Sequence, residues 1–250
     1  MYALVTGATS GIGKAIAFEL AKKGFNLLLS ARRIDELNAV KNALEGEFGV
    51  KAVVLPCDLS VRGNIAILHK EAMVYQPEIV VNNAGFGRVD LFAEVPLEDD
   101  LTMIETNVVS LHMLTKLFIK SMTSGVILNV ASMVAFLPTP LMATYSATKA
   151  YVASLGRSIH FELKASKSNV RVLTLCPGPV DTNFAKAAGV REGLKGISAE
   201  ACARFAVSGI VRKKGIIIPD WRMRFAYVLL KFMPLSWLMP LSYRLQKTKR

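Results

Sequence analysis

The chain has 250 residues, of which 52% are hydrophobic and 20% charged. This length suits one α/β domain, and the composition excludes a disordered or low-complexity protein. Its three cysteines are odd in number and far apart, so we expect a reducing compartment such as the cytoplasm, and no metal site. The first residues do not show the basic segment followed by an apolar segment that is typical of a signal peptide. No stretch of about 18 consecutive apolar residues occurs without a charged residue. We therefore expect neither a cleaved signal peptide nor a clean transmembrane helix.

The net charge of +12 is concentrated near the C-terminal end. Residues 212–250 hold ten Lys or Arg and a single acid, Asp220, so they carry nine of the twelve positive charges. A basic tail after a nearly neutral body indicates an anionic surface, lipid or nucleic acid, as a partner rather than a charged active site.

Short apolar runs alternate with longer helical patterns along the chain. The runs are near-continuous Val, Ile and Leu, which is typical of parallel strands buried on both faces. The alternation predicts a single doubly wound α/β domain over residues 1–220, with an amphipathic basic extension over 221–250. The seven predicted strands of the parallel sheet are residues 2–6, 27–31, 51–56, 79–82, 126–131, 170–176 and 215–219. Helices are predicted over residues 14–23, 34–46, 101–122 and 145–165.

A glycine-rich loop, TGATSGIG over residues 6–13, joins the first strand to the first helix. Glycines at such a junction let the backbone turn tightly and approach a pyrophosphate, and the helix N-terminus offers free N–H groups to the phosphates. The spacing is G-x-x-x-G-x-G rather than the commoner G-x-G-x-x-G, so a plain turn between strand and helix stays open. The strand–loop–helix context favours a dinucleotide site.

The pattern Tyr-x-x-x-Lys occurs three times, beginning at Tyr145, Tyr227 and Tyr243. Only Tyr145 has a serine thirteen residues upstream, Ser132, at the end of a predicted buried strand. Hydride transfer to a ketone leaves an alkoxide that a Tyr phenol can protonate. Lys149, one helical turn away, is expected to lower the pKa of that phenol, and Ser132 to bind the substrate oxygen. The other two pairs are expected at the surface or at an interface.

As a set, these motifs resemble the short-chain dehydrogenase/reductase family over about residues 2–220. Asn82-Asn83-Ala84-Gly85 resembles its NNAG element and residues 177–182 its PG element. Asn107, Ser132, Tyr145 and Lys149 match its catalytic residues. The resemblance implies a Rossmann-type fold, a nicotinamide cofactor, a homodimer or homotetramer, and a water held by Asn107 that links Lys149 to solvent. The cofactor contacts it implies are Gly7, Thr9, Ser10, Gly11, Ile12, Gly13, Asp58, Leu59, Asn83, Ala84, Gly85, Tyr145, Lys149, Pro177, Gly178, Val180 and Thr182.

Arg32 and Arg33 follow the second predicted strand, where NAD-binding proteins of this fold usually place an acid. An arginine there can pair with the 2′-phosphate of NADP through charge-assisted hydrogen bonds. We therefore expect NADP(H), while NAD or dual use, with both arginines merely solvated, remains the alternative.

The loops expected to shape the substrate pocket are apolar, and each of their residues suits the core about as well as the pocket. They carry Phe86, Met133, Phe136, Leu137, Met142 and Phe184. We expect an oxidoreductase acting on a hydrophobic ketone, aldehyde or alcohol. A non-catalytic NADP-binding regulator or scaffold is the alternative, which the retained catalytic residues disfavour.

Residues 221–250 combine aromatic and basic side chains with two prolines, Pro234 and Pro240, which disfavour a single spanning helix. One interpretation is an interfacial anchor on anionic lipid, and the other is a segment that covers the substrate pocket or packs on a neighbouring subunit. No nucleic-acid partner is expected.

Overall fold

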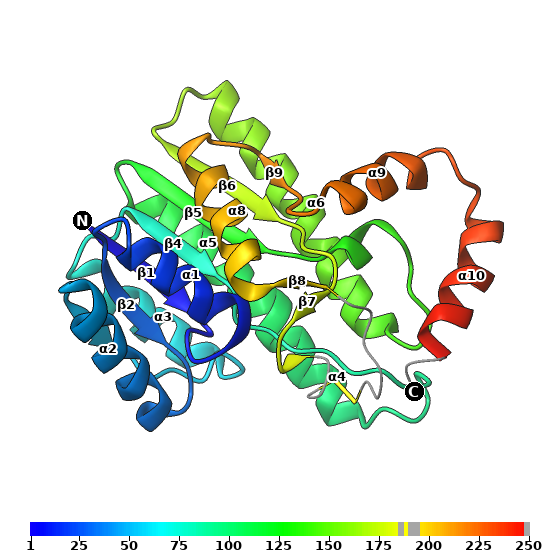
Figure 1. Cartoon of the computed structure of the whole chain (residues 1–250), viewed down its shortest axis with the longest axis horizontal. Coiled ribbons are helices and arrows are strands. Elements are labelled where there is room, and N and C mark those ends of the chain that lie inside the picture. The colour runs from blue at the N-terminus through cyan, green and yellow to red at the C-terminus, as the bar shows by residue number, and fades with distance from the viewer. Residues whose placement is uncertain (185–187, 190–195, 248–250) are drawn as a thin grey trace.

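Seven parallel strands form the central sheet of the computed structural model, which describes residues 1–184, 188–189 and 196–247 (Figure 1). The sheet has the order β3-β2-β1-β4-β5-β6-β9, so the strand order reverses beside β1. Its strands are β1 (Tyr2–Thr6), β2 (Asn26–Ser30), β3 (Ala52–Val54), β4 (Ile79–Asn82), β5 (Gly125–Val130), β6 (Val170–Leu175) and β9 (Ile216–Ile217). All seven predicted strands are confirmed, and with them the doubly wound Rossmann-type fold.

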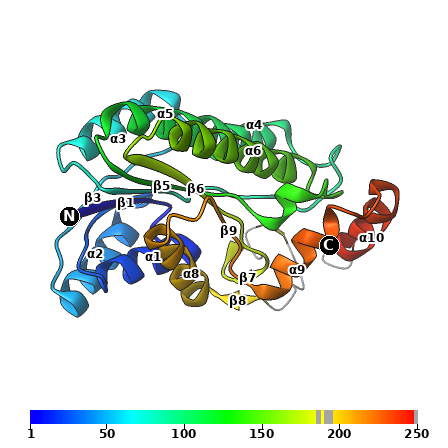
Figure 2. The ribbon, with the colours of Figure 1, turned by 90° about the horizontal axis from the view of Figure 1, so that it is seen from above.

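Helices cover both faces of this sheet, as Figure 2 shows. One face carries α1 (Gly11–Ala21), α2 (Ile34–Phe48) and α8 (Ala199–Val211). The other carries α3 (Arg62–Met73), α4 (Leu97–Ile104), α5 (Ser110–Ser121) and α6 (Ala143–Ala165). Because both faces are covered, the strands lie in apolar surroundings throughout, which is why they read as unbroken apolar runs.

The helix predicted over residues 101–122 is not continuous. A π-helical turn, Glu105–Val109, separates α4 from α5, and Asn107 lies within it with no exposed surface. Such a turn places one extra residue in the helix and redirects the side chains around it, and it often marks a functional site.

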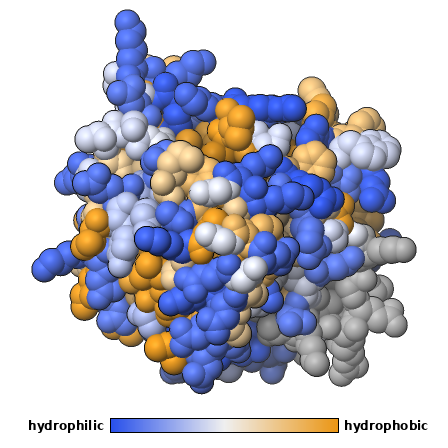
Figure 3. All heavy atoms as spheres, turned by 60° about the vertical axis from the view of Figure 1, so that its left-hand side comes forward, coloured by the Kyte–Doolittle hydropathy of each residue, from blue (hydrophilic) through white to orange (hydrophobic). Residues whose placement is uncertain are grey.

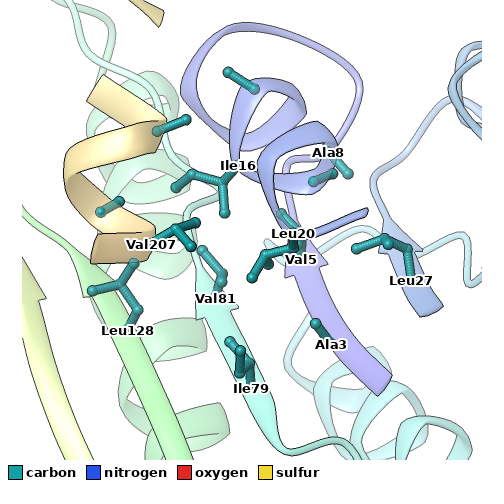
Figure 4. Close-up of a cluster of buried hydrophobic side chains, with 14 of the residues drawn as sticks. Ala3, Val5, Ala8, Ile16, Leu20, Leu27, Ile79, Val81, Leu128 and Val207 are labelled. Carbon is teal, nitrogen blue, oxygen red and sulfur yellow. The ribbon is translucent and has the colours of Figure 1, made fainter. Parts of the chain in front are cut away.

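Small and branched side chains pack α1 and α8 onto the sheet (Figure 4). Val5, Val81 and Leu128 of three neighbouring strands meet Ile16 of α1 and Val207 of α8, and all five are almost fully buried. This packing fixes α1 and the strands relative to one another. The carboxyl ends of β1, β4 and β5 therefore form a rigid edge where ligands bind in folds of this kind.

Two elements follow the body at the C-terminal end, α9 (Trp221–Leu230) and α10 (Leu235–Lys247). Both lie at the end of the molecule opposite the N-terminus in Figures 1 and 2. Pro234 separates the two helices, whereas Pro240 lies inside α10 and does not end it. A short sheet of β7 (Val180–Asp181) and β8 (Ile197–Ser198), which the sequence did not predict, precedes α8.

Across the described ranges, every helix is too short or too polar to cross a bilayer. Figure 3 brings the side of the molecule that lies left in Figure 1 forward. Hydrophilic residues cover most of this face, with apolar ones scattered between them.

Candidate active site

A pocket of about 760 Å³ lies at the carboxyl edge of the sheet. Its wall runs from the loop after β2, past β1 and β4, to the loops after β5 and β6. The predicted residues that line it are Gly7, Thr9, Ser10, Gly11, Ile12, Arg32, Arg33, Asp58, Leu59, Asn83, Ala84, Gly85, Ser132, Tyr145, Lys149, Pro177, Gly178, Val180 and Thr182. Only Gly13 and Asn107, of the predicted cofactor and catalytic residues, are not part of this wall.

The glycine loop is packed tightly against the loop after β4. Gly7 has a φ of +65°, which favours glycine, and a Cβ on Gly13 would lie 2.3 Å from the Gly7 carbonyl oxygen. The Asn83 side chain donates a hydrogen bond of 3.0 Å to the carbonyl of Thr6 and so joins the two loops. Gly13 therefore does not line the pocket, but its lack of a side chain allows α1 to lie close to the loop after β1.

The N-terminus of α1 is open toward the pocket. Its N-cap residue Ser10 makes no side-chain capping hydrogen bond, and the first turn contains no acid. Free N–H groups and the positive end of the helix dipole are the donors that a pyrophosphate needs. The residues present therefore fit the diphosphate of a dinucleotide.

Arg32 and Arg33 differ in their surroundings. Arg33 is paired with Glu36, to which its Nη2 donates at 2.7 Å, and Glu36 also hydrogen-bonds Thr9. Arg32 forms no ion pair with any described residue, and its charge helps to lower the pKa of Asp58. Glu36 also lines the pocket. This carboxylate was not among the predicted site residues, although its position three residues after Arg33 predicts the pairing.

Tyr145 and Ser132 face each other across the pocket floor. Tyr145 lies near the start of α6 and only 8% of its surface is exposed, while Ser132 directly follows β5 and Ala131. Burial raises the pKa of Tyr145 to about 12, against a smaller lowering by a hydrogen bond with Ser132. The expected lowering of this pKa by Lys149 is therefore not what the site shows. Burial dominates, and the Lys149 ammonium lies 5.7 Å from the centre of the Tyr145 ring.

Lys149 is a buried cation one turn further along α6. Its Nζ donates a hydrogen bond of 2.9 Å to the carbonyl of Val130. Burial lowers the pKa of Lys149 to about 8, since the charged form is poorly solvated there. The ammonium is thus held at the end of β5, on the helix face that also carries Tyr145.

Asn107 lies behind the pocket wall and links three elements. Its side-chain oxygen accepts from the Phe86 N–H at 3.1 Å, and its side-chain nitrogen donates to the Phe86 carbonyl at 2.9 Å and to Thr148 at 3.2 Å. These bonds hold the loop after β4 against α6, beside Lys149. The water that the family resemblance assigns to Asn107 remains a prediction.

Four of the six residues expected at the substrate end line the pocket, and the other two lie elsewhere. The four are Phe86, Met133, Met142 and Phe184, and the pocket is also lined by Val134, Asn183 and Gln246, which were not predicted. Phe136 and Leu137 are absent from the wall.

The displacement of Phe136 has a local cause. Residues Met133–Phe136 form a 3-10 turn that directs Phe136 away from the pocket. Its ring packs 4.6 Å from that of Tyr227 in α9 and 4.8 Å from the Arg157 guanidinium. The Tyr227 hydroxyl accepts from Arg157, so this Tyr-x-x-x-Lys pair is structural, and Tyr243 is 39% exposed.

Comparison with known sequences identifies relatives of this chain. A family model described as short chain dehydrogenase matches residues 1–193. The chain is 35% identical over 192 residues to a very-long-chain 3-oxoacyl-CoA reductase of Mus musculus. It is 34% identical over 191 residues to 17-beta-hydroxysteroid dehydrogenase type 3 of Homo sapiens. Each match covers 74% of this chain but only 61% of the relative's length.

Solved structures agree with this assignment. A short-chain dehydrogenase from Sphingobium yanoikuyae in complex with NADPH has a TM-score of 0.83 and 28% identity, covering 94% of this chain and 97% of the other. An alcohol dehydrogenase from Thermococcus sibiricus complexed with 5-hydroxy-NADP has a TM-score of 0.77 and 29% identity, covering 87% and 94%. With the glycine loop, the pocket and the family model in agreement, the chain belongs to the short-chain dehydrogenase/reductase family of oxidoreductases.

Proposed function

We propose that this oxidoreductase uses NADP(H) to interconvert a hydrophobic ketone or aldehyde and the corresponding alcohol. The observation that carries the proposal is the single pocket that joins the Arg32 end to an apolar end, with Tyr145, Ser132 and Lys149 between them. When bound, the nicotinamide cofactor supplies or accepts the hydride.

Tyr145 is the proton donor in the proposed reduction. Its raised pKa keeps the phenol protonated at neutral pH, which is the form needed to protonate an alkoxide. Ser132 hydrogen-bonds the same oxygen and stabilises the charge that develops on it. Lys149 holds a positive charge beside both, because a pKa of about 8 leaves most of its ammonium protonated at pH 7. Asn107 acts as a positioning residue that fixes the loop of Phe86 against α6.

The preference for an apolar substrate rests on the pocket wall. Phe86, Met133, Met142 and Phe184 offer no fixed charge to a carboxylate or phosphate placed beside Tyr145. The names of the mouse and human relatives also refer to a very-long-chain 3-oxoacyl-CoA and to a 17-beta-hydroxysteroid. Those relatives are longer than this chain, so their substrates support the class of compound rather than a particular one.

The remaining partners are proposed on separate grounds. The family resemblance supports a homodimer or homotetramer, and three free, buried cysteines are in keeping with a reducing compartment such as the cytoplasm. For residues 221–250 we propose a peripheral contact with a lipid surface.

A panel of apolar ketones and aldehydes tests the proposal, with the loss of NADPH absorbance as the readout and NADH as the matched control. We expect turnover of at least one apolar carbonyl compound, at a kcat/KM for NADPH at least tenfold above that for NADH. Tight NADPH binding with no turnover across the panel would instead favour the non-catalytic scaffold, and equal use of NADH would contradict the cofactor assignment.

A further inference from the structure

The two C-terminal helices expose large apolar side chains over their outer surface. Four aromatic residues are each exposed over more than two thirds of their surface: Trp221 (74%), Phe225 (68%), Phe232 (79%) and Trp237 (69%). The same surface also includes Val228, Leu229, Leu235 and Leu241. We call these eight residues the C-terminal apolar surface. A contiguous exposed apolar patch of this kind indicates a binding partner, whereas apolar residues scattered singly over a surface need none.

The inner sides of these helices are already packed on the protein. Met223 of α9 lies so close to Gly178 that a Cβ there would be 2.6 Å from its Cγ, and Tyr227 packs on Phe136. In α10 the buried positions are Leu238, Ser242 and Gln246, which recur every four residues. Ser242 and Gln246 thus face inward together with Leu238, while Leu235, Trp237 and Leu241 face outward. The apolar side of α10 is therefore left exposed by the described part of the chain.

The charge of the segment favours an anionic partner. Residues 221–250 contain no acid, and Arg224, Lys231, Arg244 and Lys247 flank the apolar side chains. Two further basic residues, Lys249 and Arg250, lie outside the described residues. Since the rest of the chain also carries a net positive charge, a second copy offers no net opposite charge. An anionic bilayer offers both an apolar interior and negative headgroups.

We propose that the C-terminal apolar surface binds peripherally to an anionic bilayer and places the mouth of the pocket against it. Gln246 lines the pocket from the inner side of α10, while Leu241 and Trp237 face outward from the same helix. The bilayer and the pocket are therefore separated by one helix. The binding itself is independent of the reaction, but the delivery of an apolar substrate from the bilayer rests on the proposed function.

Truncation at Asp220 would remove Met223 and Tyr227 and so disturb the body, and we therefore choose exposed residues of the full chain. Co-sedimentation is measured with vesicles of phosphatidylcholine alone and with 30 mol% phosphatidylserine, at low and high salt. The apolar variant is Phe232→Ser with Trp237→Ser. Its matched control is Phe161→Ser in α6, where Phe161 is 72% exposed and lies outside the C-terminal apolar surface. A third variant changes Lys231, Arg244 and Lys247 to Gln.

We expect the wild type to partition at least tenfold more strongly onto the anionic vesicles, and salt to weaken this binding. The apolar variant should lose at least tenfold in partition and the charge variant roughly a hundredfold, while Phe161→Ser stays unchanged. All variants should keep the wild-type melting temperature and turnover of a short water-soluble ketone without vesicles. That ketone assay tests the proposed function separately from the membrane contact.

Two results would overturn the proposal. One is equal, weak partition of the wild type and the apolar variant on anionic vesicles. The other is a concentration-dependent dimer that Phe232→Ser with Trp237→Ser dissolves, with no vesicle binding by the wild type, which would assign the surface to a second copy of the chain.

Discussion

The Nζ of Lys149 lies 2.9 Å from the carbonyl oxygen of Val130, two residues before Ser132. This hydrogen bond joins α6 to the end of β5 and so fixes the positions of Tyr145 and Ser132 relative to each other. It also holds an ammonium group where water hardly reaches, since Lys149 is only 4% exposed. The lowered pKa of Lys149 is the consequence, and it gives the site a measurable pH dependence.

The first prediction is that kcat/KM for NADPH falls as the pH rises through about 8. This parameter reports the ionisation of the free enzyme, in which burial lowers the pKa of Lys149 to about 8. Below that pH the lysine is cationic and the profile should be flat, while Tyr145, with a pKa of about 12, stays protonated throughout. A profile that is flat up to pH 10 would show that the charge of Lys149 does not matter.

Lys149→Met is expected to stabilise the cofactor-free protein while it abolishes turnover. The folded-state pKa lies below the ordinary value of 10.5, so the folded protein pays a free-energy cost for the charge at low pH. After the loss of the bond to Val130, the free energy of unfolding at pH 7 should rise by about 1–3 kcal/mol.

The lowered pKa of Lys149 determines the pH range over which Lys149→Met is more stable than the wild type. The gain is complete below pH 8 and shrinks as the pH rises toward 10.5, because the folded wild type has then lost the proton that burial disfavours while the unfolded chain still binds it. Urea unfolding at pH 7 and pH 10 measures it. A variant less stable than the wild type at pH 7 would contradict the cost assigned to the buried charge.

Arg32 and Arg33 should contribute unequally to NADPH affinity. Arg33 is already paired with Glu36, whereas Arg32 forms no ion pair with a described residue. Arg32→Ala is expected to raise the KM for NADPH at least tenfold, since a charge-assisted hydrogen bond contributes about 1.5–3 kcal/mol, and to leave the KM for NADH unchanged.

Glu36 provides the matched control for that pair. Arg33→Ala should have a smaller effect than Arg32→Ala, and Glu36→Gln should lower the KM for NADPH because it frees Arg33 and removes a like charge from the phosphate. An unchanged NADPH/NADH ratio in Arg32→Ala would place the 2′-phosphate contact elsewhere.

Gln246→Leu is expected to change which ketones the protein prefers. The Gln246 Oε1 is buried and has no hydrogen-bond partner among the described residues, which costs about 1–3 kcal/mol unless a ligand satisfies it. The variant should therefore be more stable and favour a wholly apolar ketone over the same ketone with a distal hydroxyl, by at least tenfold in kcat/KM relative to wild type.

The control for Gln246→Leu is Leu241→Ala on the outer side of α10, which should leave that ratio unchanged in the absence of lipid. An equal loss on both ketones in Gln246→Leu would mean that Gln246 only supports the packing of α10.

The parts of the fold that depend on local composition were predictable from the sequence. The strands could be predicted because they are unbroken apolar runs. The site residues could be predicted because Tyr145 and Lys149 lie one turn apart on a helix and Ser132 follows the end of a strand. The helices α3 and α8 were not predicted, although the buried residues of α8, such as Cys202, Ala206 and Ile210, recur at helical spacing.

Features that depend on contacts between residues far apart in the chain could not be predicted from the sequence. The π-helical turn at Asn107 accompanies its bonds to the Phe86 backbone, which no residue spacing reveals. Phe136 packs against Tyr227 of α9, which lies about 90 residues later in the chain. Gln246 lies on a polar face of α10, which ordinary amphipathic reasoning assigns to solvent rather than to the pocket.

Tyr145→Phe tests the central claim most directly, with Tyr243→Phe as the control from another Tyr-x-x-x-Lys pair. Single-turnover reduction of the best ketone by bound NADPH should slow by about 10²–10⁴-fold in Tyr145→Phe, because the proton donor is lost. The Kd for NADPH should stay within about twofold of wild type, and Tyr243→Phe should react at the wild-type rate. Wild-type turnover by Tyr145→Phe would contradict the assignment of Tyr145 as the acid.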